Sequence, residues 1–206
     1  MLHLSTVDST TLELLKKLQS IPILHNTRLV GGTALALQIG HRKSVDLDFF
    51  GTVDASKDEL TMALEQIGSL VVLKESPHIH IYQLNNVKID VVDYQYSWID
   101  DAVVMQGIRM ASLRDIAAMK ITAIIGRGTK KDFIDIAFLL QRFSINKILD
   151  FYSQKYPDGS TFMAMKSLAL LIADLILSRF LTMPSSCMSR STSCSVIWAT
   201  LLTSKS

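Results

Sequence analysis

The sequence predicts a mixed α/β (α+β) fold, in which a small, mixed and strongly twisted sheet is flanked by helices and followed by a helical C-terminal region. Segments rich in β-branched residues alternate with amphipathic segments through the first half, which is typical of strands mixed with helices. Beyond residue 111 the pattern becomes mainly helical. The 206 residues are 49% hydrophobic and 19% charged, so they can form a sizeable core and are not typical of a disordered chain.

Local patterns of residue type define the elements of the first half. Leucines at 12, 15 and 18 recur at helical spacing, Gly40 closes a second helix, and a capping box at Ser56–Glu59 opens a third. Asn85-Asn86 is typical of a hairpin turn between two β-branched strands. The elements expected after the first helix are strand 28–30, helix 33–39, strand 45–50, a helix through about 67, and strands 70–74, 79–84 and 87–92.

The second half is expected to be helical up to a tail of different composition. Ser112 and Asp115 occupy capping-box positions at the start of a helix that Arg127-Gly128-Thr129 breaks, and helices 131–143 and 145–155 follow. Beyond Asp174 there is no Asp or Glu, and serine and threonine are frequent. A frayed terminus and a segment encoded out of frame are both compatible with that composition.

Charge and hydropathy limit the classes of protein that the chain can represent. A net charge of +2 is too weak to indicate nucleic-acid binding, so such binding would need a local basic patch. Residues 1–19 lack a signal-peptide pattern, and the apolar run 168–181 is short for a membrane span and contains Asp174 and Arg179. We therefore expect a cytoplasmic protein with no membrane contact. Cys187 and Cys194 form neither a metal-ligand pattern nor a disulfide framework.

Asp46 and Asp48 alternate with apolar residues in the predicted strand 45–50. The period of two places both carboxylates on one face and Val45, Leu47 and Phe49 on the other. Two carboxylates in one small space repel each other, whereas Mg²⁺ takes both as oxygen ligands. The segment therefore indicates a magnesium site, and a solvated polar strand face is the alternative.

A Gly31-Gly32-Thr33 turn precedes the predicted helix 33–39. N–H groups at a helix start can point at phosphate oxygens, and glycine lets the ligand approach the backbone closely. Because the helix is short, the next strand returns beside the turn and brings its aspartates near the phosphates. Arg42 precedes that strand and can match phosphate oxygens bidentately, or lie in an exposed loop. The spacing indicates a metal–triphosphate site, whereas the glycines alone would indicate only a turn.

Lys88 and Asp90 share one face of the predicted strand 87–92, with alternate valine and isoleucine residues toward the core. Asp90 is therefore a candidate third carboxylate. In a two-metal site such a carboxylate can bridge to the metal that activates an attacking hydroxyl, and can take its proton. The alternative is an exposed residue of an edge strand.

Several separated motifs resemble the AbiEii/AbiGii-type nucleotidyltransferase toxin family, whose catalytic core resembles that of DNA polymerase β-type nucleotidyltransferases. The resemblance covers about residues 25–170, and its motifs occur in the family's order. They are Gly31-Gly32-Thr33-Ala34-Leu35 with Arg42, Ser44, Asp46, Asp48 and Phe49, then Lys88 with Asp90, then Lys120 with Asp132 and Asp135. The family implies a nucleotidyltransferase fold. The tail departs from the family pattern.

Carried over residue by residue, the resemblance implies a metal centre, an NTP site and a catalytic lysine. Asp46, Asp48 and Asp90 would bind Mg²⁺ in a two-metal site, with Mn²⁺ as an alternative ion. The implied NTP contacts are Gly31, Gly32, Thr33, Arg42, Ser44, Lys88, Asp132 and Asp135. Lys120 would act with the three carboxylates in catalysis by balancing phosphate charge as pyrophosphate leaves.

Asp132 and Asp135 stand one helical turn apart on one face of a predicted helix. They could orient Lys120 or touch the base or sugar of the nucleotide. The alternative is structural, namely capping and salt bridges to Lys130, Lys131 or Arg127.

The residue patterns and the resemblance together predict three segments, and the resemblance implies a reaction. We expect a catalytic core over 1–110, a helical region over 111–175 that closes the active-site cleft, and a poorly ordered Ser/Thr-rich tail over 176–206. The reaction would move a nucleoside monophosphate from an NTP to an acceptor hydroxyl. RNA or tRNA is the implied acceptor, in a bacterial toxin–antitoxin or abortive-infection system with a separately encoded antitoxin.

Three alternatives for the function stay open from the sequence. The first is transfer to a small molecule such as an aminoglycoside, or to a protein hydroxyl. The second is a catalytically inactive module that binds a nucleotide or a partner. The third is a metal-dependent phosphohydrolase that uses the same carboxylates.

Overall fold

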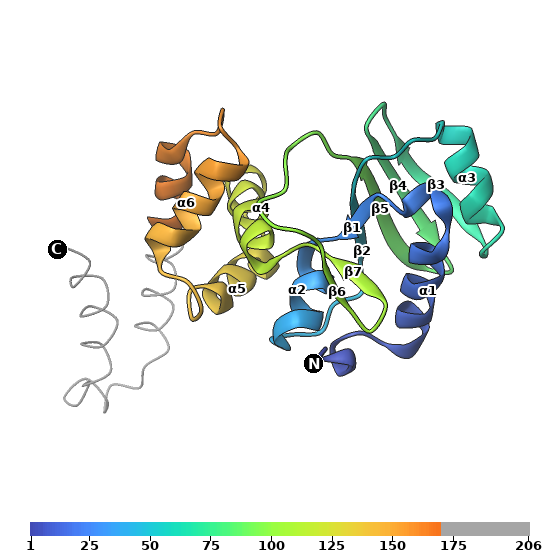
Figure 1. Cartoon of the computed structure of the whole chain (residues 1–206), viewed down its shortest axis with the longest axis horizontal. Helices are drawn as coiled ribbons and strands as arrows, with labels where there is room; N and C mark the ends of the chain where they lie inside the picture. The colour runs from blue at the N-terminus through green and yellow to red at the C-terminus, as the bar shows by residue number, and fades with distance from the viewer. Residues whose placement is uncertain (170–206) are drawn as a thin grey trace. The chain divides into compact units, whose positions relative to one another are not determined.

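A seven-stranded mixed sheet runs through the part of the chain that the structure, a computed structural model, describes, which is residues 1–169 (Figure 1). The strand order is β3-β4-β5-β2-β1-β7-β6. Parallel pairing joins β2 to β5 and β1 to β7, and the other neighbours are antiparallel. The strands are β1 (Thr27–Leu29), β2 (Leu47–Gly51), β3 (Leu70–Glu75), β4 (Ile79–Leu84), β5 (Val87–Asp93), β6 (Val103–Met105) and β7 (Ile108–Met110). The mixed α/β class predicted from the sequence is confirmed.

Helices flank this sheet and then dominate the second half. They are the 3-10 turns η1 (Leu4–Thr6) and η2 (Pro22–Leu24), with helices α1 (Ser9–Ser20), α2 (Gly31–Ile39), α3 (Lys57–Glu65), α4 (Leu113–Gly126), α5 (Lys130–Leu139) and α6 (Ile145–Lys155). Residues 161–169 are also helical. Met1–Ser167 form one compact unit. Among the described residues, no helix combines the length and the apolar character that a membrane span needs. The predicted tail over 176–206, with Cys187 and Cys194, lies outside the residues that the structure describes.

The two central parallel strands place apolar and acidic residues on opposite faces of the sheet. Leu47 and Phe49 of β2 and Ile89 and Val91 of β5 are fully buried. Asp48 and Asp90, which alternate with them, are direct neighbours in the β2–β5 register and are only partly buried. The alternation predicted from the sequence therefore puts one face into the core and turns an acidic face outward.

Some boundaries differ from the sequence prediction. β2 begins at Leu47, so Val45 does not reach the core and is 54% exposed, and Asp46 lies just before the strand. α5 ends at Leu139, whereas a helix through residue 143 was expected. α2 begins at Gly31, so the glycines form the first turn of the helix and do not precede it.

The β6–β7 hairpin was not predicted. Its strands have three residues each, too few to show a period of two, and its turn at Gln106-Gly107 uses left-handed backbone at φ 52° and 77°. β7 pairs with β1, and Ala111 N–H donates to the Leu29 carbonyl at 2.9 Å. The hairpin therefore extends the sheet on the β1 side and leads directly into α4.

A buried ion pair attaches α6 to α4. Lys155 Nζ lies 2.7 Å from Asp115 Oδ1, and both side chains are inaccessible to solvent. Asp115 also accepts hydrogen bonds from the Ser112 hydroxyl at 2.8 Å and from Ile99 N–H at 2.9 Å. The segment between β5 and β6, which includes Ile99, is therefore fixed to α4, the helix that carries Lys120.

Candidate active site

The turn from β1 into α2 brings a glycine against an acidic side chain. Val30 N–H donates to the Asp48 carbonyl at 2.8 Å, which extends the β1–β2 pairing to the start of α2. Gly31 then adopts φ 68°, and a Cβ atom there would overlap the Asp48 carboxylate. Val30, at the N-cap, provides no side-chain cap for the first N–H groups of α2. The helix start is therefore suited to bind an anion beside Asp48.

We expect Gly31→Ala to damage both the fold and the site. Alanine would have to adopt a left-handed φ and to displace the Asp48 carboxylate, which together should cost about 1–3 kcal/mol of unfolding free energy. Chemical denaturation measures this cost. Gly107→Ala is a matched control because Gly107 has φ 77° but an added Cβ would meet no atom within 4 Å. An equal loss in the two variants would show that the approach of Gly31 to Asp48 has no energetic effect.

Three carboxylates interact on the outward face of the sheet. Asp48 has a pKa raised to about 6, first because the surrounding protein keeps water from its carboxylate and then because Asp90 and Asp46 repel its charge. Lys88 and Lys120 act in the opposite direction. The structure thus makes Asp48 and Asp90 direct neighbours and places Asp46 within electrostatic range of Asp48. Repulsion among these charges is the electrostatic condition that a bound cation relieves.

The carboxylates fit Mg²⁺ in chemistry, but their present arrangement is not a finished metal site. Lys88 Nζ lies 2.6 and 2.8 Å from the two carboxylate oxygens of Asp90, which gives this acid a counter-charge from its own strand. Within residues 1–169 no three Asp, Glu, His or Cys side chains converge closely enough to hold one metal ion. Asp46, Asp48 and Asp90 remain the donors that would hold it, because hard oxygen ligands are those that Mg²⁺ prefers.

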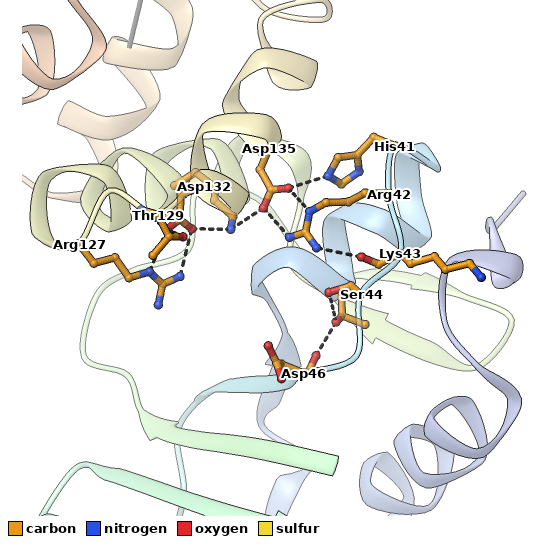
Figure 2. Close-up of polar contacts among 11 residues, drawn as sticks. His41, Arg42, Lys43, Ser44, Asp46, Arg127, Thr129, Asp132 and Asp135 are labelled. Carbon is orange, nitrogen blue, oxygen red and sulfur yellow. Dashed lines mark hydrogen bonds and ion pairs between the residues drawn. The ribbon is translucent and has the colours of Figure 1, made fainter. Parts of the chain in front are cut away.

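A hydroxyl pair determines where Asp46 lies (Figure 2). Thr33, fully buried in α2, has its Oγ1 2.9 Å from Ser44 Oγ and hydrogen-bonds the main-chain oxygen of Asp46. Ser44 N–H donates to the Thr6 carbonyl at 2.9 Å. The segment before β2 is therefore fastened to α2. In this structure the hydroxyls of Thr33 and Ser44, which were expected to contact the NTP, bond to the protein itself, and these bonds position Asp46.

Asp135 of α5 is a buried carboxylate surrounded by donors (Figure 2). Arg42 donates to both of its oxygens, at 2.7 and 3.0 Å, Lys120 Nζ lies 2.6 Å away, and His41 Nε2 lies 2.7 Å away. Burial alone raises a carboxyl pKa, but the bonds from His41 and Arg42 and the charge of Lys120 outweigh it. The pKa of Asp135 therefore lies well below its usual range, and the residue acts as a charged anchor.

Asp132, one turn earlier on α5, anchors a second set of donors. Lys120 Nζ lies 3.0 Å from it, and Arg127 donates to its two oxygens at 2.9 and 3.0 Å. The Thr129 hydroxyl donates at 2.6 Å in a capping box that opens α5. The bonds from Arg127 and Thr129 outweigh burial and hold the pKa of Asp132 below its usual range.

Both aspartates of α5 thus form ion pairs with lysine and arginine side chains of this chain. Lys120, 6% exposed, bridges them, so the structure shows the contacts needed to orient this lysine. Arg42 reaches from Asp135 to the first turn of α2, where a Cβ on Gly32 would overlap its guanidinium. A continuous ion network therefore connects α5 and α4 to the glycine turn.

His41 is a residue of this network that the sequence did not single out. Its side chain is inaccessible to solvent, its Nε2 contacts Asp135, and it packs against Phe138 at 5.3 Å between ring centroids. The only available signal was its place next to Arg42, because no metal-ligand spacing accompanies it.

Comparisons with known proteins agree with this geometry. The sequence profile of the family described as nucleotidyl transferase AbiEii toxin, type IV TA system, matches residues 13–178. A protein of Aquifex aeolicus (strain VF5), called uncharacterized protein aq_aa25, is 32% identical over 162 residues, which cover 76% of this chain and 79% of that protein. The solution structure of the antibiotic-resistance factor ANT(2'')-Ia shares the fold, with a TM-score of 0.56 and 16% identity over 71% of this chain and 91% of that one.

The matched range, residues 13–178, spans most of the chain. The chain therefore belongs to the AbiEii toxin family and is a nucleotidyltransferase.

Proposed function

We propose that the protein is the toxin of a bacterial toxin–antitoxin system and transfers a nucleoside monophosphate from an NTP to a hydroxyl of RNA, such as a tRNA end. One observation carries the transfer reaction: Asp48 lies against Gly31 and is also the register neighbour of Asp90. An anion-binding turn and a carboxylate pair therefore meet at one place. The family supports the toxin role and a separately encoded antitoxin.

In the proposed reaction the acceptor hydroxyl attacks the α-phosphate, and the bond between that phosphorus and the pyrophosphate oxygen breaks. The hydroxyl proton passes to a carboxylate, for which Asp90 is the candidate. When bound by Asp46, Asp48 and Asp90, Mg²⁺ or Mn²⁺ would supply stabilisation of the charge on the reacting phosphate. The partly buried position of Asp48 strengthens such interactions because water screens them less.

Main-chain and cationic groups would hold the triphosphate. The start of α2 has no side-chain cap, so the N–H groups of Gly31 and Gly32 would bind phosphate oxygens. Lys120 would balance charge on the departing pyrophosphate. The two α5 aspartates hold Lys120 in place, which reduces the reorganisation that catalysis requires. We propose residues 1–110 as the catalytic core and 111–175 as the region that supplies this lysine and closes the site.

Exposed lysines at the start of α5 support an acceptor that carries phosphates. Lys130 and Lys131 are exposed, and neither has an ion-pair partner within residues 1–169. Free lysines suit the backbone of a nucleic acid, whereas an aminoglycoside would be favoured by acidic side chains. RNA is therefore the preferred acceptor over a cationic small molecule.

Incubation with each α-³²P-labelled NTP, Mg²⁺ and total RNA tests the proposal. We expect one or more of the nucleotides to label RNA, with release of pyrophosphate, and we expect Asp48→Ala to abolish the labelling. Equal labelling by the variant would remove Asp48 from the catalytic role.

The products distinguish the other functions. Label on the protein fraction or on an added aminoglycoside would replace RNA as the acceptor. Release of nucleotide products with no labelled acceptor would indicate a phosphohydrolase, and the absence of pyrophosphate with every NTP would indicate a binding module.

A further inference from the structure

Arg127, the C-cap residue that follows α4, carries an anchored guanidinium that remains open to solvent. Its Nε and Nη2 donate to the two oxygens of Asp132, and its side chain is nevertheless 65% exposed. Within residues 1–169, its Nη1 makes no hydrogen bond. One edge of the guanidinium is thus fixed to the protein, and the other edge offers free donors (Figure 2).

The anchor itself is rigid. Asp132 is 1% exposed, and it is fixed by the Thr129 capping box and by Lys120 on α4. A forked pair of bonds holds a guanidinium in one plane, which a single bond to a lysine cannot do. Arg127 would therefore lose little conformational freedom when it binds a ligand.

A shared carboxylate places Arg127 beside the candidate catalytic lysine. Arg127 donates to Asp132 at 2.9 and 3.0 Å, and Lys120 Nζ lies 3.0 Å from the same aspartate. In agreement with this geometry, the bonds to Asp132 raise the pKa of Arg127, and the charges of Asp48 and Asp90 act in the same direction. Arg127 therefore belongs to the ion network that orients Lys120, although it comes from the helical half of the chain.

The ion network around Asp132 and Asp135 carries one surplus positive charge. Arg42, Lys120 and Arg127 give +3, and Asp132 and Asp135 give −2, so the network keeps a formal charge of +1. Arg42 and Lys120 are 16% and 6% exposed, whereas Arg127 is 65% exposed, so the surplus charge is accessible mainly at Arg127. A guanidinium edge matches the oxygens of a phosphate or a carboxylate, and the NTP of the proposed reaction supplies phosphates.

We propose that Arg127 binds a phosphate group of the NTP triphosphate, and that Asp132 is the positioning residue that aims it. This inference rests on the proposed function, and adds to it Arg127 as a ligand of the triphosphate. The triphosphate is preferred to the acceptor RNA because Arg127 shares Asp132 with Lys120, the lysine proposed to act on the departing pyrophosphate. Within residues 1–169, the exposed Lys130 and Lys131 form no such ion pair.

Calorimetric titration with Mg²⁺ complexes of ATP, CTP, GTP and UTP, and with Mg²⁺ and inorganic tripolyphosphate, tests the proposal. For the NTP that binds, we expect Arg127→Gln to raise Kd by about ten-fold or more, as for loss of a charged hydrogen bond. The Kd for tripolyphosphate should rise by a similar factor. Arg127→Lys should recover only part of the affinity, because an ammonium cannot make the two parallel hydrogen bonds by which Asp132 holds the guanidinium. Asp132→Asn should also weaken NTP binding. The double variant Asp132→Asn/Arg127→Gln should bind NTP only slightly more weakly than Asp132→Asn alone.

Arg114→Gln is the matched control. Arg114 also lies on α4, is 41% exposed and pairs with Asp100 at 2.8 Å, so its loss should leave both Kd values unchanged. Wild-type affinity in Arg127→Gln would overturn the role of Arg127, and so would a loss of RNA binding with NTP binding intact. If the wild-type protein bound none of the four NTPs, the proposed function itself would fail, which is a distinguishable result.

Discussion

Asp48→Asn is expected to yield a protein that is more stable than the wild type at pH 8 and almost inactive. The pKa of Asp48 is raised from 3.8 to about 6, which corresponds to roughly 2–3 kcal/mol of unfavourable free energy for its charged form in the folded state. Asparagine has nearly the same shape and no charge, so it removes this cost. It also removes one of the proposed metal ligands and should reduce nucleotidyl transfer by about a thousand-fold.

The sign of the stability change depends on pH. Because the folded-state pKa is raised, ionisation of Asp48 lowers the free energy of unfolding of the wild type as the pH rises from about 4 through 6. Above that range the full destabilisation by the charged carboxylate is present. The advantage of Asp48→Asn should therefore be absent near pH 4 and complete at pH 8. Urea denaturation across this range, without divalent metal, measures it.

Asp93→Asn provides the control, because Asp93 ends the same strand as Asp90 and pairs with an exposed His78 at 3.1 Å. This variant should keep both its activity and its stability within about 0.5 kcal/mol. If Asp48→Asn were less stable than the wild type at pH 8, the acidic residues would not repel one another in the way described here. Mg²⁺ should also raise the Tm of the wild type more than that of Asp48→Asn.

The elements with a distinctive boundary residue were the best predicted. The capping box at Ser56–Glu59 opens α3 as expected, and α6 covers the residues predicted for it, 145–155. Asn85 and Asn86 both adopt positive φ between β4 and β5, which few other residues do easily. In each case a local preference and the tertiary structure agree, so the sequence alone was sufficient.

Contacts between distant segments were harder to predict than the elements. The sequence identified Asp132 and Asp135 but left open whether they face a nucleotide or the protein. That choice depends on Arg42 and His41, which are more than 90 residues away from Asp135 and approach it only in the folded chain. Spacing shows which residues share a face of one helix, but it does not show which side chain lies opposite that face.

Asp135→Asn, the same chemical change as Asp48→Asn, should have the opposite effect on stability. Asp135 is the common partner of Arg42, Lys120 and His41. An amide would leave Arg42 without its carboxylate partner and would leave Lys120 with Asp132 alone, in a buried setting. Removal of one partner from a buried ion pair costs about 3–5 kcal/mol. Activity should also fall, because Lys120 and Arg42 would lose the group that orients them.

The pH dependence separates this effect from simple damage to packing. The folded-state pKa of Asp135 is lowered, so its contribution is present above the ordinary value of 3.8 and is lost as the pH falls through the folded-state value. The deficit of Asp135→Asn in urea denaturation should therefore be greatest near neutral pH and become smaller in acid.

A packing defect would instead persist at every pH. Asp100→Asn is the control, because its partner Arg114 is 41% exposed and the loss of that surface pair should cost less than about 1 kcal/mol. Opposite signs for Asp48→Asn and Asp135→Asn at pH 8 would show that the two carboxylates have opposite electrostatic roles. Asp48 is held against like charges that a cation relieves, and Asp135 is held among cations that it stabilises.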